Sequence, residues 1–327
     1  MKPMTQDGAL SCTKIGSMRF DVRSIVKVFI VMPRFAIATM VLLFAVVSAR
    51  SVQAQETPTD LLVQAWQEYG LQAFYNADAL FARVADVSKG ETRWQALFGQ
   101  AQITHYQMPG RDPAAAIPLY EALLAEIALS EAGDAGPWRG LILARLADCH
   151  AELQPQQIDR ARSLYREALA ETPPNSPMVQ ETTLRLLATY LQIPDRAEIS
   201  RGLQVADEFA AQMADSPFAS VFHGLRAEMA FFVADYPALA AALDAQYQAG
   251  ISNIKVKELV LFRLARLHEV ELGDYERAEA YYRTLVREVP SSKKAHFAGL
   301  RADELRASKL DSDYAPPLSK RSAADGQ

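Results

Sequence analysis

Small, apolar and polar side chains recur along this chain at the spacing of amphipathic helices. In the clearest unit, Gly273–Pro290, Ala278 is followed four residues later by Tyr282 and twelve residues later by Pro290. Residues four apart lie on one face of a helix, so the small side chain and the ring share a face. The spacing predicts a helix that packs closely on a neighbour through Ala278 and Tyr282 and that ends at Pro290.

The same spacing occurs throughout the chain. Small or aliphatic anchor residues stand at Ala77, Ala116, Ala161, Val205, Leu239 and Ala278. A large residue follows each anchor at plus four, namely Phe81, Tyr120, Tyr165, Phe209, Leu243 and Tyr282. The gaps between anchors are 39, 45, 44, 34 and 39 residues, and a period of this size is typical of stacked helical repeats.

A second motif precedes most anchors. The tetrapeptide Leu-Ala-Arg-Leu occupies 143–146 and again 264–267, and Leu187-Ala188, Leu225-Arg226-Ala227 and Leu97-Phe98-Gly99 hold similar places. Each unit therefore predicts a helix A with a leucine and a small residue such as Ala265, a turn, and a helix B with the anchor. Gly273 can end a helix A and Asp274 can cap the next helix B. Pro118 lies inside the helix predicted to begin at Pro113, so we expect a kink there.

These motifs resemble the tetratricopeptide repeat (TPR), whose pattern matches Gly273–Pro290 nearly residue for residue. The resemblance covers residues 61–307, with four good units and two weaker ones. It implies an all-α protein, an α-solenoid of about six stacked antiparallel helix pairs. Most gaps exceed the family period of about 34 residues, so the superhelix is expected to be irregular. His268 also stands where the family usually has an aromatic residue.

The first 54 residues differ from the rest. An uncharged apolar run of thirteen residues, Phe35–Val47, follows Arg34 and precedes a small-residue site that ends at Ala54. This pattern predicts a signal peptide over 1–54 that is cleaved after Ala54, and it fits best if translation starts at Met32. The alternative is an uncleaved membrane anchor.

Removal of residues 1–54 leaves 27 basic and 37 acidic side chains, a net charge of −10. Such a surface repels phosphates, so we expect no nucleic-acid partner. Only Cys149 remains of the two cysteines, which excludes an intramolecular disulfide and predicts a buried, inert thiol.

Motifs of enzymes and cofactor sites are missing from the sequence. There is no phosphate-binding loop, no zinc-binding His-Glu-x-x-His and no Gly-x-Ser-x-Gly. The neighbours Cys149 and His150 point about 100° apart on a helix, which is a poor arrangement for a nucleophile and its base. We therefore predict no enzyme activity, no cofactor and no metal.

Partner-binding residues are harder to choose. Arg145 and Arg266 follow the small residue of helix A in the two identical tetrapeptides, and TPR proteins use this surface to hold peptides. Trp94 and Trp138 are candidate aromatic anchors. The resemblance and the predicted export imply a non-catalytic adaptor of the bacterial cell envelope that holds a peptide or helix in its groove. Two alternatives stay open: an accessory or catalytic subunit of an enzyme acting on envelope polymers, and a scaffold tethered to the membrane. The polar tail, 308–327, is predicted to be disordered.

Overall fold

The structure is a computed structural model that describes residues 57–107, 111–129, 135–174 and 176–310. The predicted signal peptide and residues 311–327 of the predicted tail lie outside the described residues. Within those residues, no helix has both the length and the apolar character that a bilayer span requires.

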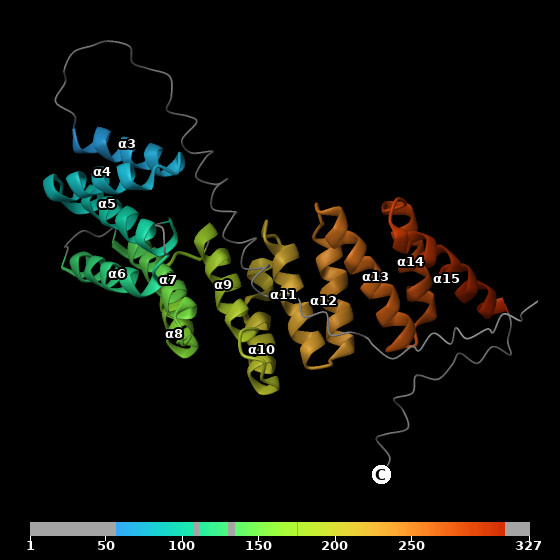
Figure 1. The fold of residues 1–327 in the computed structure, drawn as a ribbon. Coiled ribbons are helices and arrows are strands. Elements are labelled where there is room, and N and C mark those ends of the chain that lie inside the picture. Colours follow the sequence, from blue (N-terminus) through green and yellow to red (C-terminus); the bar gives the residue numbers. More distant parts are fainter. Residues whose placement is uncertain (1–56, 108–110, 130–134, 175, 311–327) are drawn as a thin grey trace, which may run out of the picture. The chain divides into compact units, whose positions relative to one another are not determined.

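The described residues form thirteen α-helices and one short π-helical segment (Figure 1). The helices are α3 (Pro58–Gly70), α4 (Phe74–Val87), α5 (Gly90–Gln102), α6 (Pro113–Ala128), α7 (Ala135–Glu152), α8 (Ile158–Glu171), α9 (Pro177–Tyr190), α10 (Arg196–Met213), α11 (Ala219–Phe232), α12 (Tyr236–Gln248), α13 (Ile254–Val270), α14 (Tyr275–Glu288) and α15 (Lys293–Leu310). The π-helical segment η1 (Ile103–Gln107) follows α5.

Each helix packs against the helix before it and the helix after it in the sequence (Figure 1). We name the successive pairs repeats 1 to 6, from α3–α4 to α13–α14, and call the odd-numbered helices A and the even-numbered helices B. A helices of adjoining repeats also touch each other, for example α7 and α9. Helix α13 likewise touches α15, the A helix that follows repeat 6. This arrangement confirms the predicted all-α class of stacked helix pairs with a TPR-like solenoid fold.

The anchors occupy the B helices, one in each repeat. All six of them are buried, as is Ala265 on the A helix α13. The rings of Phe81, Tyr120, Tyr165 and Tyr282 are also buried. Two of the predicted packing residues differ: Phe209 is only half-buried, and Pro290 is exposed. Pro290 stands two residues after the last residue of α14, where it ends the helix without contributing to the contact between helices.

Small residues bring the helices close together. A Cβ atom added at Gly99 on α5 would lie 2.5 Å from the ring of Phe81 on α4, far inside van der Waals contact. The glycine therefore admits the aromatic residue of the preceding repeat, which packs there with its full apolar surface out of water.

The turns follow from their residue types. Gly273 has φ +66°, the left-handed region that side chains with a Cβ disfavour, and the Asp274 side chain accepts from the Arg277 amide at the start of α14. Helix α6 continues through Pro118, and the kink expected there stays a prediction.

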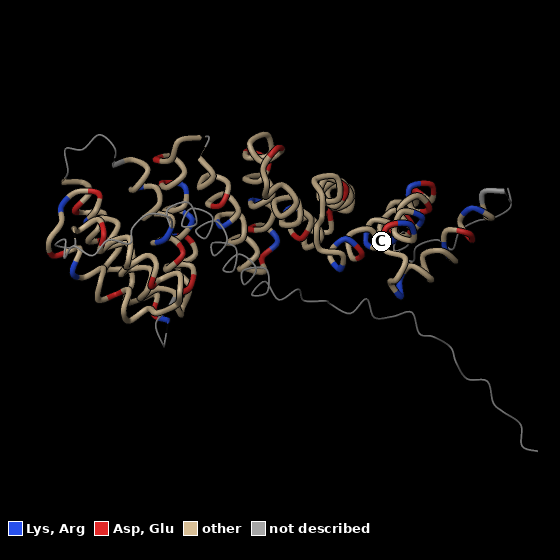
Figure 2. The backbone as a smooth tube through the Cα atoms, turned by 90° about the horizontal axis from the view of Figure 1, so that it is seen from above, with Lys and Arg blue, Asp and Glu red and all other residues tan. Residues whose placement is uncertain are grey.

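Helix α15 extends further than the sequence indicated. It runs to Leu310, so residues 308–310 of the predicted disordered tail are helical. Its last turns are held because Leu305 is buried against repeat 6 and the Ser308 hydroxyl donates to the Leu305 carbonyl. Along the described helices, acidic and basic residues are interspersed (Figure 2).

Candidate partner-binding site on the A helices

A buried carboxylate ties together the helices around repeat 3. Asp148, near the end of α7, accepts from the Tyr165 hydroxyl at 2.6 Å and from the Tyr106 hydroxyl at 2.9 Å. It also accepts from the guanidinium groups of Arg145 at 3.1 Å and Arg185 at 2.7 Å. Burial alone would raise the pKa of Asp148, but the charges of Arg185 and Arg145 outweigh it and hold this pKa well below its usual range. Asp148 is therefore a buried, ionised, fully bonded group.

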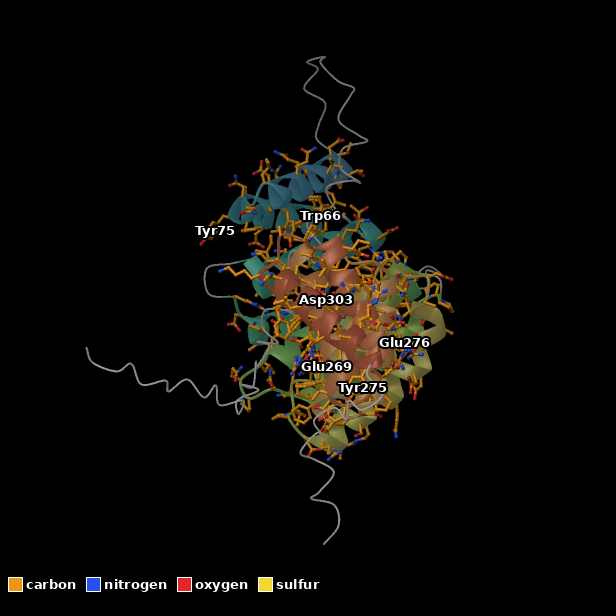
Figure 3. All side chains as sticks on the ribbon, turned by 90° about the vertical axis from the view of Figure 1, so that its right-hand side faces the viewer. Trp66, Tyr75, Glu269, Tyr275, Glu276 and Asp303 are labelled. Carbon is orange, nitrogen blue, oxygen red and sulfur yellow. The ribbon has the colours of Figure 1, made fainter. Side chains whose placement is uncertain are left out.

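Repeat 6 holds the same network. Glu269 on α13 accepts from the Tyr282 hydroxyl at 2.7 Å and from Arg301 at 2.9 and 2.8 Å (Figure 3 labels Glu269). Arg266 lies 3.7 Å from the same carboxylate.

The two networks share four positions, and the Asp148 network has in addition Tyr106, on η1. In each, the acid lies three residues after the arginine of the shared tetrapeptide, the tyrosine comes from helix B, and a second arginine comes from the A helix of the next repeat. Each network thus joins three helices across a boundary between repeats. We call them the Asp148 network and the Glu269 network.

The two predicted partner-binding arginines have different surroundings. The Arg145 side chain is 12% exposed and is bound to Asp148, with Glu181 at 3.6 Å. These internal contacts hold Nη1 of its guanidinium group, while Nε is buried without a partner among the described residues, and the partner role of Arg145 stays a prediction. The Arg266 side chain is 42% exposed, lies 3.7 Å from Glu269 and also neighbours the Tyr282 hydroxyl. Arg266 can therefore reach a partner.

The tryptophans are packing residues. Trp94 is buried and offers little ring surface in this structure, and its role as a partner anchor stays a prediction. Trp138 is half-buried, its ring lies edge-on to Phe98 at 5.9 Å between centroids, and its N–H donates to Glu91 at 3.3 Å. The Trp138 ring thus serves the contact between repeats 2 and 3.

An exposed aromatic residue that sequence reasoning missed lies close to Arg266. Phe231 on α11 is 49% exposed, and the Arg263 guanidinium of α13 lies 5.1 Å from its ring centroid. Arg263 also pairs with Glu228 at 2.5 Å. The sequence did contain a sign of this exposed ring, namely the adjacent phenylalanines Phe231 and Phe232. Neighbouring residues on a helix point about 100° apart, so the two rings cannot both be buried on one face.

These side chains form one surface. Residues three apart share a helix face, which places Glu228 with Phe231 and Arg263 with Arg266. Arg301 joins them through Glu269. We call this surface, made of Glu228, Phe231, Arg263, Arg266 and Arg301, the A-helix patch.

A cysteine, a histidine and a carboxylate also meet in the structure. The Cys149 sulfur lies 3.4 Å from Nδ1 of His105, and Nε2 of His105 lies 3.3 Å from Glu152. The order resembles that of a nucleophile, a base and an orienting acid. Both Cys149 and His105 are fully buried, however, and burial raises the pKa of the Cys149 thiol far above its ordinary value. The thiol therefore stays protonated and out of reach of a substrate.

The sequence missed this contact because His105 lies 44 residues from Cys149, on the π-helical segment. Among the described residues, no group of three or more histidine, cysteine, aspartate or glutamate side chains is arranged to hold a metal ion.

Comparison with known proteins agrees with this fold. Residues 259–292, which contain most of α13 and all of α14, match the tetratricopeptide repeat family. No curated protein matches the chain. Among solved structures, the apo form of RapI is 10% identical, with a TM-score of 0.54 over 89% of this chain and 79% of its own.

A second structure is the C-terminal part of a TPR repeat-containing protein from Cytophaga hutchinsonii. It is 14% identical, with a TM-score of 0.52 over 85% of this chain and 99% of its own. At such identities the likeness concerns the fold alone. The class is thus a TPR-like helical solenoid, and repeat 6 is the unit whose sequence matches the family.

Proposed function

We propose that this protein is a non-catalytic scaffold that binds an acidic segment of a partner protein on the A-helix patch. The observation that carries this proposal is the exposed guanidinium of Arg266 beside a carboxylate that other groups already bind. Arg266 stays positioned by Glu269 but keeps donors for a carboxylate of the partner, and arginine binds carboxylates through two parallel hydrogen bonds.

The composition of the patch defines the partner segment. Glu228 pairs with Arg263, and both Glu269 and Glu304 pair with Arg301, so the charges of the patch and its partners balance and the exposed positive charge is that of Arg266. Phe231 adds an exposed ring, and aromatic residues and arginines are the side chains that most often dominate binding energy at interfaces. The partner segment therefore carries one or two carboxylates and an aliphatic or aromatic side chain.

An array of acidic peptides, each with one large apolar residue, tests the proposal with the full chain. Peptides that bind are measured by fluorescence anisotropy against Arg266→Glu. We expect affinity to fall at least about tenfold, because a charge reversal replaces an attractive contact by a repulsive one.

Arg277→Glu on helix B provides the matched control, since Arg277 is 70% exposed and also pairs with an acid three residues away. Binding that falls equally in both variants reflects the net charge of the protein and contradicts the patch. An array without any binding peptide contradicts the proposed scaffold role itself.

We further propose that the protein acts as an adaptor in the bacterial cell envelope. The support is the apolar run Phe35–Val47 followed by the cleavage pattern at Ala54. The test is N-terminal sequencing of the protein recovered from the envelope fraction of a Gram-negative host. A mature start at Gln55 agrees with export and cleavage. Retention of Phe35–Val47 favours the tethered scaffold, and recovery from the cytoplasm alone contradicts both.

A further inference from the structure

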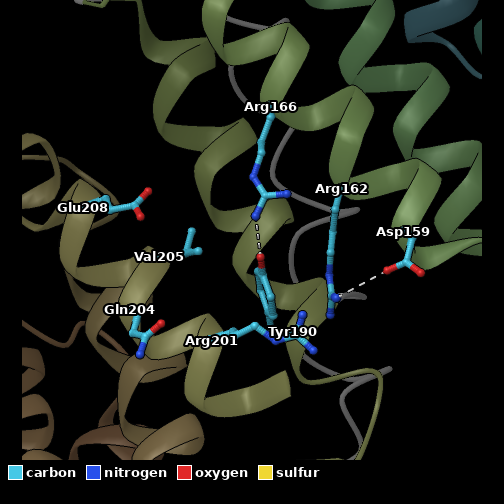
Figure 4. A pocket seen from close by; sticks show the side chains of 8 residues that line it. All are labelled: Asp159, Arg162, Arg166, Tyr190, Arg201, Gln204, Val205 and Glu208. Carbon is cyan, nitrogen blue, oxygen red and sulfur yellow. Dashed lines mark hydrogen bonds and ion pairs between the residues drawn. The ribbon is translucent and has the colours of Figure 1, made fainter. Parts of the chain in front are cut away.

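A cavity of about 350 Å³ is lined by residues of α8, α9 and α10, none of which belongs to the A-helix patch (Figure 4). Arg162 and Arg166 line it from α8, Arg201 lines it from α10, and Tyr190 lines it from the end of α9. Pockets of this size hold small molecules in other proteins. Three guanidinium groups around one cavity are unusual in a chain whose acidic residues outnumber its basic ones.

Close helix packing shapes the cavity. A Cβ atom added at Gly202 on α10 would lie 2.7 Å from Cβ of Tyr190, so only glycine lets α10 approach α9 this closely. Tyr190 is buried, and the Arg162 guanidinium covers its ring at 3.9 Å from the centroid. The Tyr190 hydroxyl accepts from Arg166 at 2.7 Å (Figure 4), which leaves its own O–H to donate to a bound group.

Arg162 is a fixed cation at the base of the cavity. It donates to the Thr189 hydroxyl at 3.0 Å, to the Thr189 carbonyl at 3.2 Å and to Glu198 at 2.8 Å. Burial lowers the pKa of Arg162, Tyr190 and Asp159 act in the opposite direction, and the charges of Arg201 and Arg166 add a smaller lowering effect. An anion in the cavity would relieve this repulsion.

Two carboxylates limit the charge that the cavity can accept. Asp159 and Glu208 line it as well, and both are exposed. Glu198, which pairs with both Arg162 and Arg201, offsets the charge of the third arginine, so three arginines face three acids around the cavity. This balance disfavours a polyanion such as nucleic acid, and an anion here must be small enough to be held by direct hydrogen bonds.

We propose that this cavity binds the phosphate group of a small phosphate monoester. One arginine satisfies a planar carboxylate through its two oxygens. Guanidinium groups that approach from two helices, together with the Tyr190 hydroxyl, instead match a tetrahedral group with three acceptor oxygens. Arg166 and Arg201 contact the phosphate directly, and Arg162 holds Tyr190 in place and supplies charge. Repeats 3 and 4 thus carry a ligand site that is independent of partner binding on repeats 5 and 6.

Isothermal titration calorimetry of the full chain with inorganic phosphate, at constant ionic strength in chloride, tests the site. We expect Arg166→Gln and Arg201→Gln each to weaken phosphate binding at least about tenfold, since each removes a charge-assisted contact. Arg277→Gln is the control and should bind like the wild type. It matches Arg201, because both pair with an acid three residues before them and the two side chains are 70% and 62% exposed. Circular dichroism checks that all variants remain helical.

Sodium acetate under the same conditions separates a phosphate site from a general carboxylate site. Acetate that binds as tightly as phosphate overturns the assignment. So does the absence of phosphate binding, and so does phosphate binding that Arg166→Gln and Arg201→Gln leave unchanged.

Discussion

The Asp148 and Glu269 networks begin from the same tetrapeptide and have different surroundings. In the Asp148 network, Glu181 on α9 binds Arg185 at 2.6 Å and lies 3.6 Å from Arg145 on α7. Both arginines are therefore covered by a second carboxylate. Glu181 stands four residues before Arg185. Four residues before Arg301, the corresponding arginine in α15, stands Phe297, which cannot bind a guanidinium through a carboxylate.

In the Glu269 network the second carboxylate on Arg301 is instead Glu304, three residues after it, and Arg266 is 42% exposed. We call the Asp148 network closed, because Glu181 covers its arginines and the network holds three helices together. We call the Glu269 network open, because Arg266 is exposed and can contact a partner. The same tetrapeptide therefore leaves its arginine 12% exposed in one network and 42% exposed in the other, so the motif alone does not determine the surroundings of this arginine.

The tyrosines should contribute equally to both networks. Tyr165→Ala and Tyr282→Ala are each expected to lower the free energy of unfolding by about 3–5 kcal/mol, because each removes a buried ring and leaves a cavity. Denaturation in urea, followed by circular dichroism, measures the loss. A loss below about 1 kcal/mol for either variant would mean that the ring is not packed between helices.

The carboxylates should separate the two networks. Asp148→Asn leaves two covered arginines with Glu181 as their remaining counter-ion, and removal of one partner from a buried ion pair costs about 3–5 kcal/mol. Glu269→Gln should cost about half as much, because water can solvate Arg266 and Arg301 more readily. The same urea titration compares the two variants. Equal losses would show that exposure of the arginines does not distinguish the networks.

Acid should weaken the closed network. The pKa of Asp148 is depressed in the folded protein, so its contribution is present above the unfolded value of about 3.9 and is lost as the pH falls through the folded value. The free energy of unfolding should therefore decrease below about pH 4 more steeply in the wild type than in Asp148→Asn. Urea titrations from pH 6 to pH 2 give both curves. Parallel curves would contradict an ionised Asp148 held by Arg185 and Arg145.

Much of the fold could be predicted from local spacing, and little of the site could. The anchors, the left-handed Gly273 and the Asp274 cap depend on residues within one repeat, so i, i+4 patterns and turn chemistry were sufficient. The environment of Arg145 depends on Glu181 of the next repeat, 36 residues further along, and no local pattern reveals that contact.

Arg145 and Arg266 illustrate how far local sequence patterns can predict the surroundings of a side chain. Identical tetrapeptides suggested identical roles, but the following A helices place Glu181 in one network and Phe297 at the corresponding position of the other. The gaps between anchors vary from 34 to 45 residues, so contacts between repeats vary as well. The contacts of a residue in one repeat therefore cannot be assumed for the corresponding residue in another repeat.

The most direct test of this account is a parallel measurement on Arg266→Gln and Arg145→Gln, with unfolding free energy and acidic-peptide affinity determined on the same samples. Arg266→Gln should change stability by less than about 0.5 kcal/mol, as surface substitutions usually do, and weaken peptide binding at least about tenfold. Arg145→Gln should cost about 1.5–3 kcal/mol through its lost bond to Asp148 and leave binding unchanged. A stability loss in Arg266→Gln as large as that in Arg145→Gln, with peptide binding intact, would contradict the distinction between the closed and the open network.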